Sequence, residues 1–82
     1  MIKIQYYGLL RKLTRVNEES MDVRRVAEVI KQIDKRYGKK VAVEAKMSFI
    51  LVNGTNAALL KGYRTTLKDG DLVQIMPVTA GG

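Results

Sequence analysis

The sequence predicts an α+β fold in which one main helix packs across a mixed sheet of four to five strands. The chain opens with seven residues that alternate between apolar and more polar side chains, as in a strand. Residues 22–37 carry apolar side chains at helical spacing, and residues 48–52 and 72–76 form two later runs typical of strands. With 82 residues there is room for one hydrophobic core. We therefore expect one domain over residues 1–76 and a flexible tail over residues 77–82.

The N-terminal segment is expected to contain two strands around a short helical turn. Residues 1–7 predict a half-buried strand, because every second side chain is apolar. Gly8 interrupts this strand, and leucines at three-to-four spacing in residues 9–13 predict a helical turn. Residues 16–21 are more polar and are expected to form the second, shorter strand.

The main helix is expected to begin near Asp22 and to end at Gly38. Ser20 or Asp22 is placed to cap its first amides. Six apolar residues share one face of this helix and should contact the sheet. They are Val23, Val26, Ala27, Ile30, Ile33 and Tyr37. Residues 39–46 alternate only weakly, so strand, helical turn and loop all remain open for that segment.

The second half of the chain predicts two further strands separated by turns. Residues 48–52 are nearly all apolar, as in a strand covered on both faces, and they end at the turn-forming pair Asn53-Gly54. Residues 68–71 contain two Asp and one Gly and predict another turn. Residues 72–76 then predict a strand, whose pairing should end at Pro77 because proline has no backbone N–H.

The composition removes several function classes. Without cysteine, the chain has no disulfide, no thiolate metal site and no iron–sulfur cluster. It also lacks histidine, the commonest general base, so we do not expect it to catalyse a reaction alone. No apolar run is long enough to span a bilayer and no secretory signal is recognisable, so we expect a soluble, cytoplasmic protein.

Fifteen Lys and Arg residues against eight Asp and Glu residues give a formal net charge of +7. A basic nucleic-acid-binding module is one hypothesis for this charge, and a solvated surface is the alternative that we favour. Asp69 and Asp71 suggest a turn rather than a metal site, because Asp side chains bond nearby backbone amides. Tyr6 and Tyr37 fall on expected core faces rather than on a surface that stacks on bases.

Four segments of the chain carry a family resemblance. They are Tyr7-Gly8-Leu9-Leu10-Arg11, Val52-Asn53-Gly54, Leu67-Lys68-Asp69-Gly70-Asp71-Leu72-Val73 and the terminal Gly81-Gly82. In this order they resemble the MoaD/ThiS family of sulfur carriers, which shares the β-grasp fold with ubiquitin, and the resemblance covers almost the whole chain. Family members often end in Pro-Pro-Val-X-Gly-Gly, whereas here Met76 stands before Pro77.

The resemblance implies that the working group is the C-terminal carboxylate of Gly82. In the family an activating enzyme of the MoeB/ThiF type adenylates this carboxylate with ATP, and a sulfur donor such as a cysteine desulfurase then converts it to a thiocarboxylate. The residues before it, Thr79, Ala80 and Gly81, would thread into the partner enzyme, and glycine suits this role because it has no Cβ. The chain itself is expected to bind no cofactor.

The resemblance also suggests partners. The leading hypothesis is the small subunit of molybdopterin synthase, which donates sulfur within a large, MoaE-like subunit. Carriers for thiamine thiazole synthesis or tRNA thiolation are alternatives, as is a ubiquitin-like modifier joined to lysines of target proteins. Tyr7 and Met76 could form an apolar docking patch, and basic residues could steer an acidic partner surface. These basic residues are Arg11, Lys12, Arg64 and Lys68.

Overall fold

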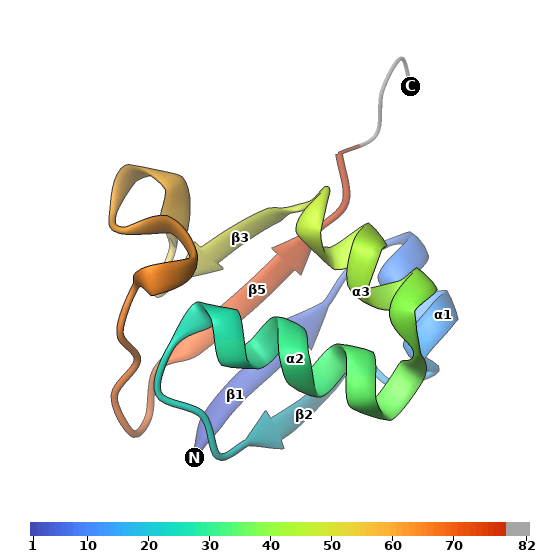
Figure 1. The fold of residues 1–82 in the computed structure, drawn as a ribbon, viewed down its shortest axis with the longest axis horizontal. Coiled ribbons are helices and arrows are strands. Elements are labelled where there is room, and N and C mark those ends of the chain that lie inside the picture. The colour runs from blue at the N-terminus through green and yellow to red at the C-terminus, as the bar shows by residue number, and fades with distance from the viewer. Residues whose placement is uncertain (79–82) are drawn as a thin grey trace.

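The computed structural model describes residues 1–78 and places them in one five-stranded mixed sheet with helices on one face (Figure 1). The elements in chain order are β1 (Ile2–Tyr6), α1 (Leu9–Thr14), β2 (Glu18–Met21), α2 (Val26–Tyr37), α3 (Lys39–Lys46), β3 (Phe49–Val52), β4 (Thr55–Asn56), the 3-10 turns η1 (Ala57–Leu59) and η2 (Gly62–Arg64), and β5 (Leu72–Met76). The strand order is β2-β1-β5-β3-β4. The predicted α+β fold is confirmed, with five strands.

The strands β1 and β5 lie side by side and parallel near the centre of the sheet. β2 pairs antiparallel with β1, and β3 pairs antiparallel with both β5 and β4. Alternation buries Ile4 and Tyr6 of β1, and Val73 and Ile75 of β5, on the side covered by the helices. β5 ends at the residue before Pro77, as predicted.

The helix α2 crosses the sheet, but it starts at Val26 and not near Asp22. Arg25 forms a β-bridge with Thr66, so the chain just before α2 is extended rather than helical. Neither predicted cap, Ser20 nor Asp22, is used, because no side chain caps the first amides of α2. The capping signals were therefore overridden by pairing with a segment far away in the sequence.

The buried face of α2 also differs in part from the prediction. Its buried side chains are Val26, Val29, Ile30 and Ile33. Val29 was not assigned to this face, and Ala27, which was, is exposed. The stripe at helical spacing is real, but it is centred on Val26, Val29, Ile30 and Ile33, and Ala27 lies about 100° around the helix from Val26, at the edge of that stripe.

The segment left open by the sequence forms the helix α3, so a second helix joins the expected main helix. Gly38 separates α2 from α3 with a φ of 99° and a ψ of 167°. Val41, Ala42 and Ala45 are buried, a spacing that belongs to a helix and not to a strand. α3 packs against α2 and also contacts α1.

The strand β3 is covered on one face only, and the prediction of two covered faces was wrong. Ile50 and Val52 are buried, whereas Phe49 is 49% exposed and Leu51 is half-buried. The helices lie on one side of the sheet (Figure 1), so alternate side chains of β3 face away from them. The turn after β3 is as predicted, with positive φ at both Asn53-Gly54 positions.

A polar cluster joins β1, β2 and α2. The carboxylate of Glu19 accepts hydrogen bonds from the hydroxyl of Tyr6 at 2.5 Å, the hydroxyl of Tyr37 at 2.7 Å and the guanidinium of Arg36 at 2.6 Å. The rings of Tyr6 and Tyr37 meet edge to face, with 6.3 Å between their centroids. The predicted core position of both tyrosines is confirmed, Tyr6 being fully buried and Tyr37 half-buried.

Candidate functional site at the base of the tail

The strand β5 carries the chain from the centre of the sheet toward its C-terminus. After Met76 the ring of Pro77 lies against Gly8, where an added Cβ would be 3.6 Å from the proline Cγ. Gly8 has a φ of 55°, a conformation that suits glycine. The chain therefore leaves the sheet beside the start of α1. The predicted tail residues Thr79, Ala80, Gly81 and Gly82 lie outside the described residues.

Apolar side chains surround this exit point. Met76 lies opposite Phe49 across the β3–β5 pair, on the sheet face that the helices leave open. Val78 and Leu9 continue the apolar margin beyond the sheet, and both are about half exposed. Met47 is the C-cap residue of α3, two residues before Phe49, and is 66% exposed, and we call it together with these residues the tail-base surface. Its members are Leu9, Met47, Phe49, Met76 and Val78.

Tyr7 and Arg11 border the tail-base surface. The register that places Tyr6 opposite Ile75 puts Tyr7 beside Met76 on the open face. The hydroxyl of Tyr7 donates to the side-chain oxygen of Gln5 at 3.0 Å. The guanidinium of Arg11 lies 5.7 Å from the centre of the Tyr7 ring, close enough for a cation–π contact. A positive charge is thus held next to the apolar exit.

The six proposed docking residues do not form one patch, and Lys12 is simply an exposed residue of α1. Tyr7, Arg11 and Met76 come together at the exit point, as described above. Lys68 lies before the opposite end of β5, and a five-residue strand spans about 13 Å between its terminal Cα atoms. Arg64 belongs to η2, where it borders a separate hollow. Any contact through Arg64 or Lys68 would therefore use a different part of the surface.

The apolar pattern of the sequence did not predict that Phe49 and Met47 are exposed. A short run of apolar residues looks alike whether a strand is covered on one face or on both. Strand alternation could have identified Phe49. If only one face of the sheet is covered and Ile50 of β3 faces the core, its neighbour Phe49 must face solvent.

The turn before β5 serves structure. The carboxylate of Asp71 accepts hydrogen bonds from the side chain of Asn53 at 3.0 Å and from the N–H of Lys68 at 2.8 Å. These two bonds hold the pKa of Asp71 below its usual value.

Among residues 1–78, no cluster of three or more acidic, His or Cys side chains could hold a metal ion. In the same part of the chain, no helix has the length and apolar character that crossing a bilayer requires.

Comparison with known proteins identifies the family. The sequence matches the ThiS family over residues 4–82. A Pyrococcus furiosus protein described as molybdopterin converting factor, subunit 1, is 29% identical with a TM-score of 0.79, over 95% of this chain and 97% of that one. The small archaeal modifier protein 1 from Methanosarcina acetivorans is 25% identical with a TM-score of 0.82, over 99% of this chain and 95% of that one.

The Amycolatopsis orientalis BexX/CysO complex contains a chain with the same fold, 22% identical with a TM-score of 0.84 over the full length of both chains. A comparison with curated proteins found no match. The fold and the family match together define a β-grasp, ubiquitin-like protein of the sulfur-carrier class. The chain belongs to the ThiS family.

Proposed function

We propose that this protein carries sulfur as a thiocarboxylate on Gly82 and delivers it during molybdopterin synthesis. The observation that carries the proposal is the family match, which runs from β1 to the last residue. The tail-base surface supports it, because half-exposed apolar side chains at the root of a tail suit docking on an enzyme. The Pyrococcus furiosus protein, described as a molybdopterin converting factor subunit, supports the choice of pathway.

The chemistry starts with activation of the carboxylate by ATP on a separate enzyme of the MoeB/ThiF type. A carboxylate oxygen attacks the α-phosphate, pyrophosphate leaves, and an acyl-adenylate forms. A persulfide, supplied by a donor such as a cysteine desulfurase, then adds to the acyl carbon and AMP leaves. Reduction of the resulting acyl disulfide by a thiol frees the thiocarboxylate, whose sulfur attacks the acceptor held by a large, MoaE-like subunit.

The chain's own residues would position this group rather than transform it. Phe49 and Met76 would seat the sheet on the activating enzyme, and the Arg11 guanidinium beside Tyr7 would meet an acidic rim. Each residue of an extended tail adds about 3.3–3.6 Å of reach. A docked carrier could therefore present Gly82 inside a cleft of its partner.

A ubiquitin-like protein modifier is the second candidate. It is favoured by the similarity to the small archaeal modifier protein 1, at 25% identity over nearly the whole chain. Both functions begin with the same adenylate and differ in the nucleophile that follows. Sulfur gives a carrier, whereas a lysine amine gives an isopeptide bond.

Intact-mass spectrometry tests the proposal and separates the two candidates. The purified chain is incubated with an activating enzyme, ATP, a persulfide donor and a thiol reductant, with and without a candidate target protein. We expect a mass gain equal to the exchange of one oxygen for one sulfur, absent in a variant that lacks Gly82. Lysine adducts in place of that exchange would favour the modifier, and an unchanged mass would contradict both.

A further inference from the structure

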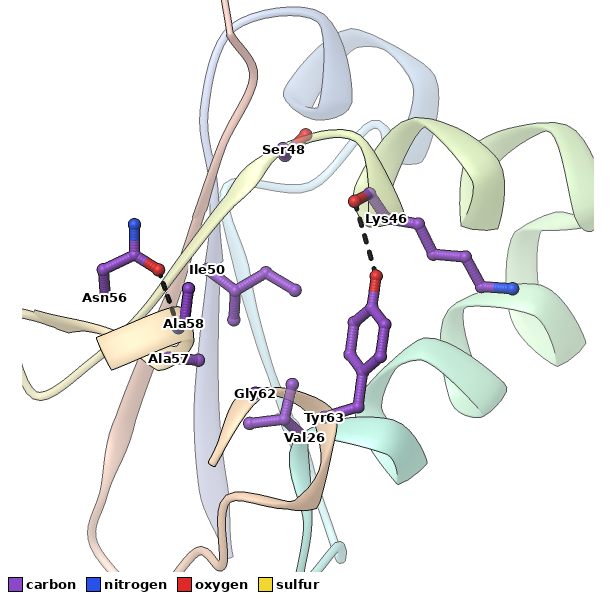
Figure 2. A pocket seen from close by; sticks show the side chains of 9 residues that line it. All are labelled: Val26, Lys46, Ser48, Ile50, Asn56, Ala57, Ala58, Gly62 and Tyr63. Atoms are coloured by element: carbon purple, nitrogen blue, oxygen red, sulfur yellow. Dashed lines mark hydrogen bonds between the residues drawn. The ribbon is translucent and has the colours of Figure 1, made fainter. Parts of the chain in front are cut away.

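An apolar groove lies on the helical side of the sheet, next to η2. Figure 2 shows its first hollow, of about 260 Å³, where Ile50 of β3 and Val26 of α2 form the floor and Tyr63 stands at one side. A second hollow of about 290 Å³ lies beside α2, with Ala27 and Ile30 in its lining. Both hollows are lined mainly by apolar atoms, which in the second include the aliphatic stems of Lys31 and Lys46.

Tyr63 and Lys46 line both hollows and so join them into one groove. The hydroxyl of Tyr63 reaches the backbone carbonyl of Lys46, at 3.4 Å (Figure 2). The ring of Tyr63 is 46% exposed, so it stands between the hollows without closing either of them. A pair of adjacent apolar side chains on one segment would fit this arrangement.

A third hollow, of about 200 Å³, adjoins the groove through η2. Arg25, Lys61, Arg64 and Thr66 line it. Two hydrogen bonds hold the backbone around this hollow. The N–H of Val26 donates to the carbonyl of Thr65 at 3.1 Å, and the N–H of Leu67 donates to the carbonyl of Arg24 at 2.8 Å. The cations therefore project from a fixed turn and not from a loose loop.

The charge around the three hollows has one sign. Five cationic side chains line them, and their linings contain no carboxylate. The five are Arg25, Lys31, Lys46, Lys61 and Arg64. None of the five forms an ion pair within residues 1–78. Apolar hollows edged by unpaired positive charge complement a segment that combines apolar and acidic side chains.

We propose that this groove binds an acidic peptide segment of a partner protein, with its apolar side chains in the two hollows beside Tyr63. A nucleic acid fits less well, because its phosphates would lie against aliphatic surface and only one aromatic ring is available for stacking. The groove is separate from the tail-base surface. Ile50 faces the groove, whereas its neighbour Phe49 faces the open side of the sheet. The segment can therefore bind while the tail is engaged elsewhere.

The test uses the full chain and a short peptide in which glutamates alternate with leucine and phenylalanine. Binding is followed by NMR on isotope-labelled protein at low salt, and affinity by fluorescence anisotropy. The comparison peptide has glutamine at every glutamate. We expect shifts of the backbone amides of Ala27, Lys46 and Tyr63, and at least about fivefold weaker binding of the glutamine peptide.

Matched double variants show whether position or net charge matters. Lys31→Gln with Lys46→Gln removes two charges beside the groove, and Lys12→Gln with Lys39→Gln removes two exposed charges away from it. We expect the first pair to weaken binding at least about fivefold and the second less than about twofold. Equal weakening by both pairs would overturn the proposal. So would unshifted groove amides at millimolar peptide, or tighter binding of oligouridylate through the same amides.

Discussion

The carboxylate of Glu19 joins β2 to α2 and to the buried end of β1. Partial burial by itself would raise the pKa of Glu19, but hydrogen bonds from Tyr6, Tyr37 and Arg36 outweigh it and hold the pKa below the ordinary value of 4.5. Burial and the same contacts with Glu19 raise the pKa of the hydroxyls of Tyr6 and Tyr37. Burial, together with the neighbouring carboxylate, raises the pKa of Tyr37 to about 12. The cluster is therefore most stable with Glu19 charged and both tyrosines protonated.

Replacing this carboxylate with an amide should make the protein less stable in a pH-dependent way. We expect Glu19→Gln to lower the free energy of unfolding by about 1–2 kcal/mol at neutral pH, because charge-assisted bonds become neutral ones. A depressed folded-state pKa gives stability that is present above pH 4.5 and lost as the pH falls through the folded value. The difference between variant and wild type should therefore shrink below about pH 4.5. Urea denaturation from neutral to acidic pH measures it.

Asp71 supplies an internal control, because its lowered pKa adds the same acid sensitivity to both proteins. Only the difference between them reports on Glu19. A difference that stayed constant down to pH 3 would mean that the charge of Glu19 contributes nothing to stability.

At the scale of elements, Gly38 decides how the helical layer is divided. Its φ of 99° and ψ of 167° are open to glycine and costly for other residues. This break lets α3 turn back and pack against α2, so the groove beside Lys46 and Ala27 depends on it.

We expect Gly38→Ala to lower the free energy of unfolding by about 1–3 kcal/mol, through backbone strain alone. A Cβ added at Gly38 would meet nothing within 4 Å, so no steric clash contributes. Lys39→Ala, an exposed neighbour, should change stability by less than about 0.5 kcal/mol. Denaturant unfolding of both variants checks this, and equal stabilities would argue against a strained junction.

The strands β1 and β5 and the main helix could be predicted because each has an apolar period of its own. α3 could not, since the weak alternation of Val41, Val43 and Ala45 fits a strand as well as a helix, and contacts with α1 and α2 accompany the helix. The start of α2 was misplaced for a similar reason, because Arg25 is held in extended form by Thr66, some forty residues later. A local sequence pattern predicts an element correctly when the hydrogen bonds of that element form within it. The prediction fails when a distant segment pairs with the same backbone.

The same distinction applies to the candidate site. Tyr7 and Met76 follow from strand register, so the sequence could place them together. Arg64 and Lys68 depend on the path of the connection between β4 and β5, which carries little periodic signal. The one-sided cover of β3, which exposes Phe49, depends on where the helices pack and not on β3 itself.

The open face of β3 gives a test of docking that leaves the core intact. If Phe49 seats the carrier on its activating enzyme, Phe49→Asp should slow ATP–pyrophosphate exchange at least about tenfold, as expected for a buried aromatic contact. Leu60→Asp is a matched control, because Leu60 is 48% exposed and lies between η1 and η2. We expect nearly unchanged exchange for that control. Equal effects of the two variants would show that Phe49 has no specific role in docking.

At the scale of the whole molecule, the two faces of the sheet have different roles. The helical face carries the hydrophobic core and the basic groove (Figure 1), whereas the open face carries Phe49 and Met76. Within residues 1–78, the buried core extends from Ile2 to Ile75. Stability and the proposed chemistry should therefore be separable by truncation.

Deleting Gly81-Gly82 should change the free energy of unfolding by less than about 0.5 kcal/mol, because glycine has no side chain to contribute to a hydrophobic core. The same deletion should abolish adenylation and the exchange of oxygen for sulfur. Gly82→Ala keeps the chain length and the carboxylate but adds a Cβ, so it should reduce the rate while leaving stability unchanged. Thermal unfolding and intact-mass spectrometry on the three proteins measure both effects. A loss of more than about 1 kcal/mol on deletion would mean that the tail packs on its own domain, and a tail held in this way could not reach into a partner's cleft.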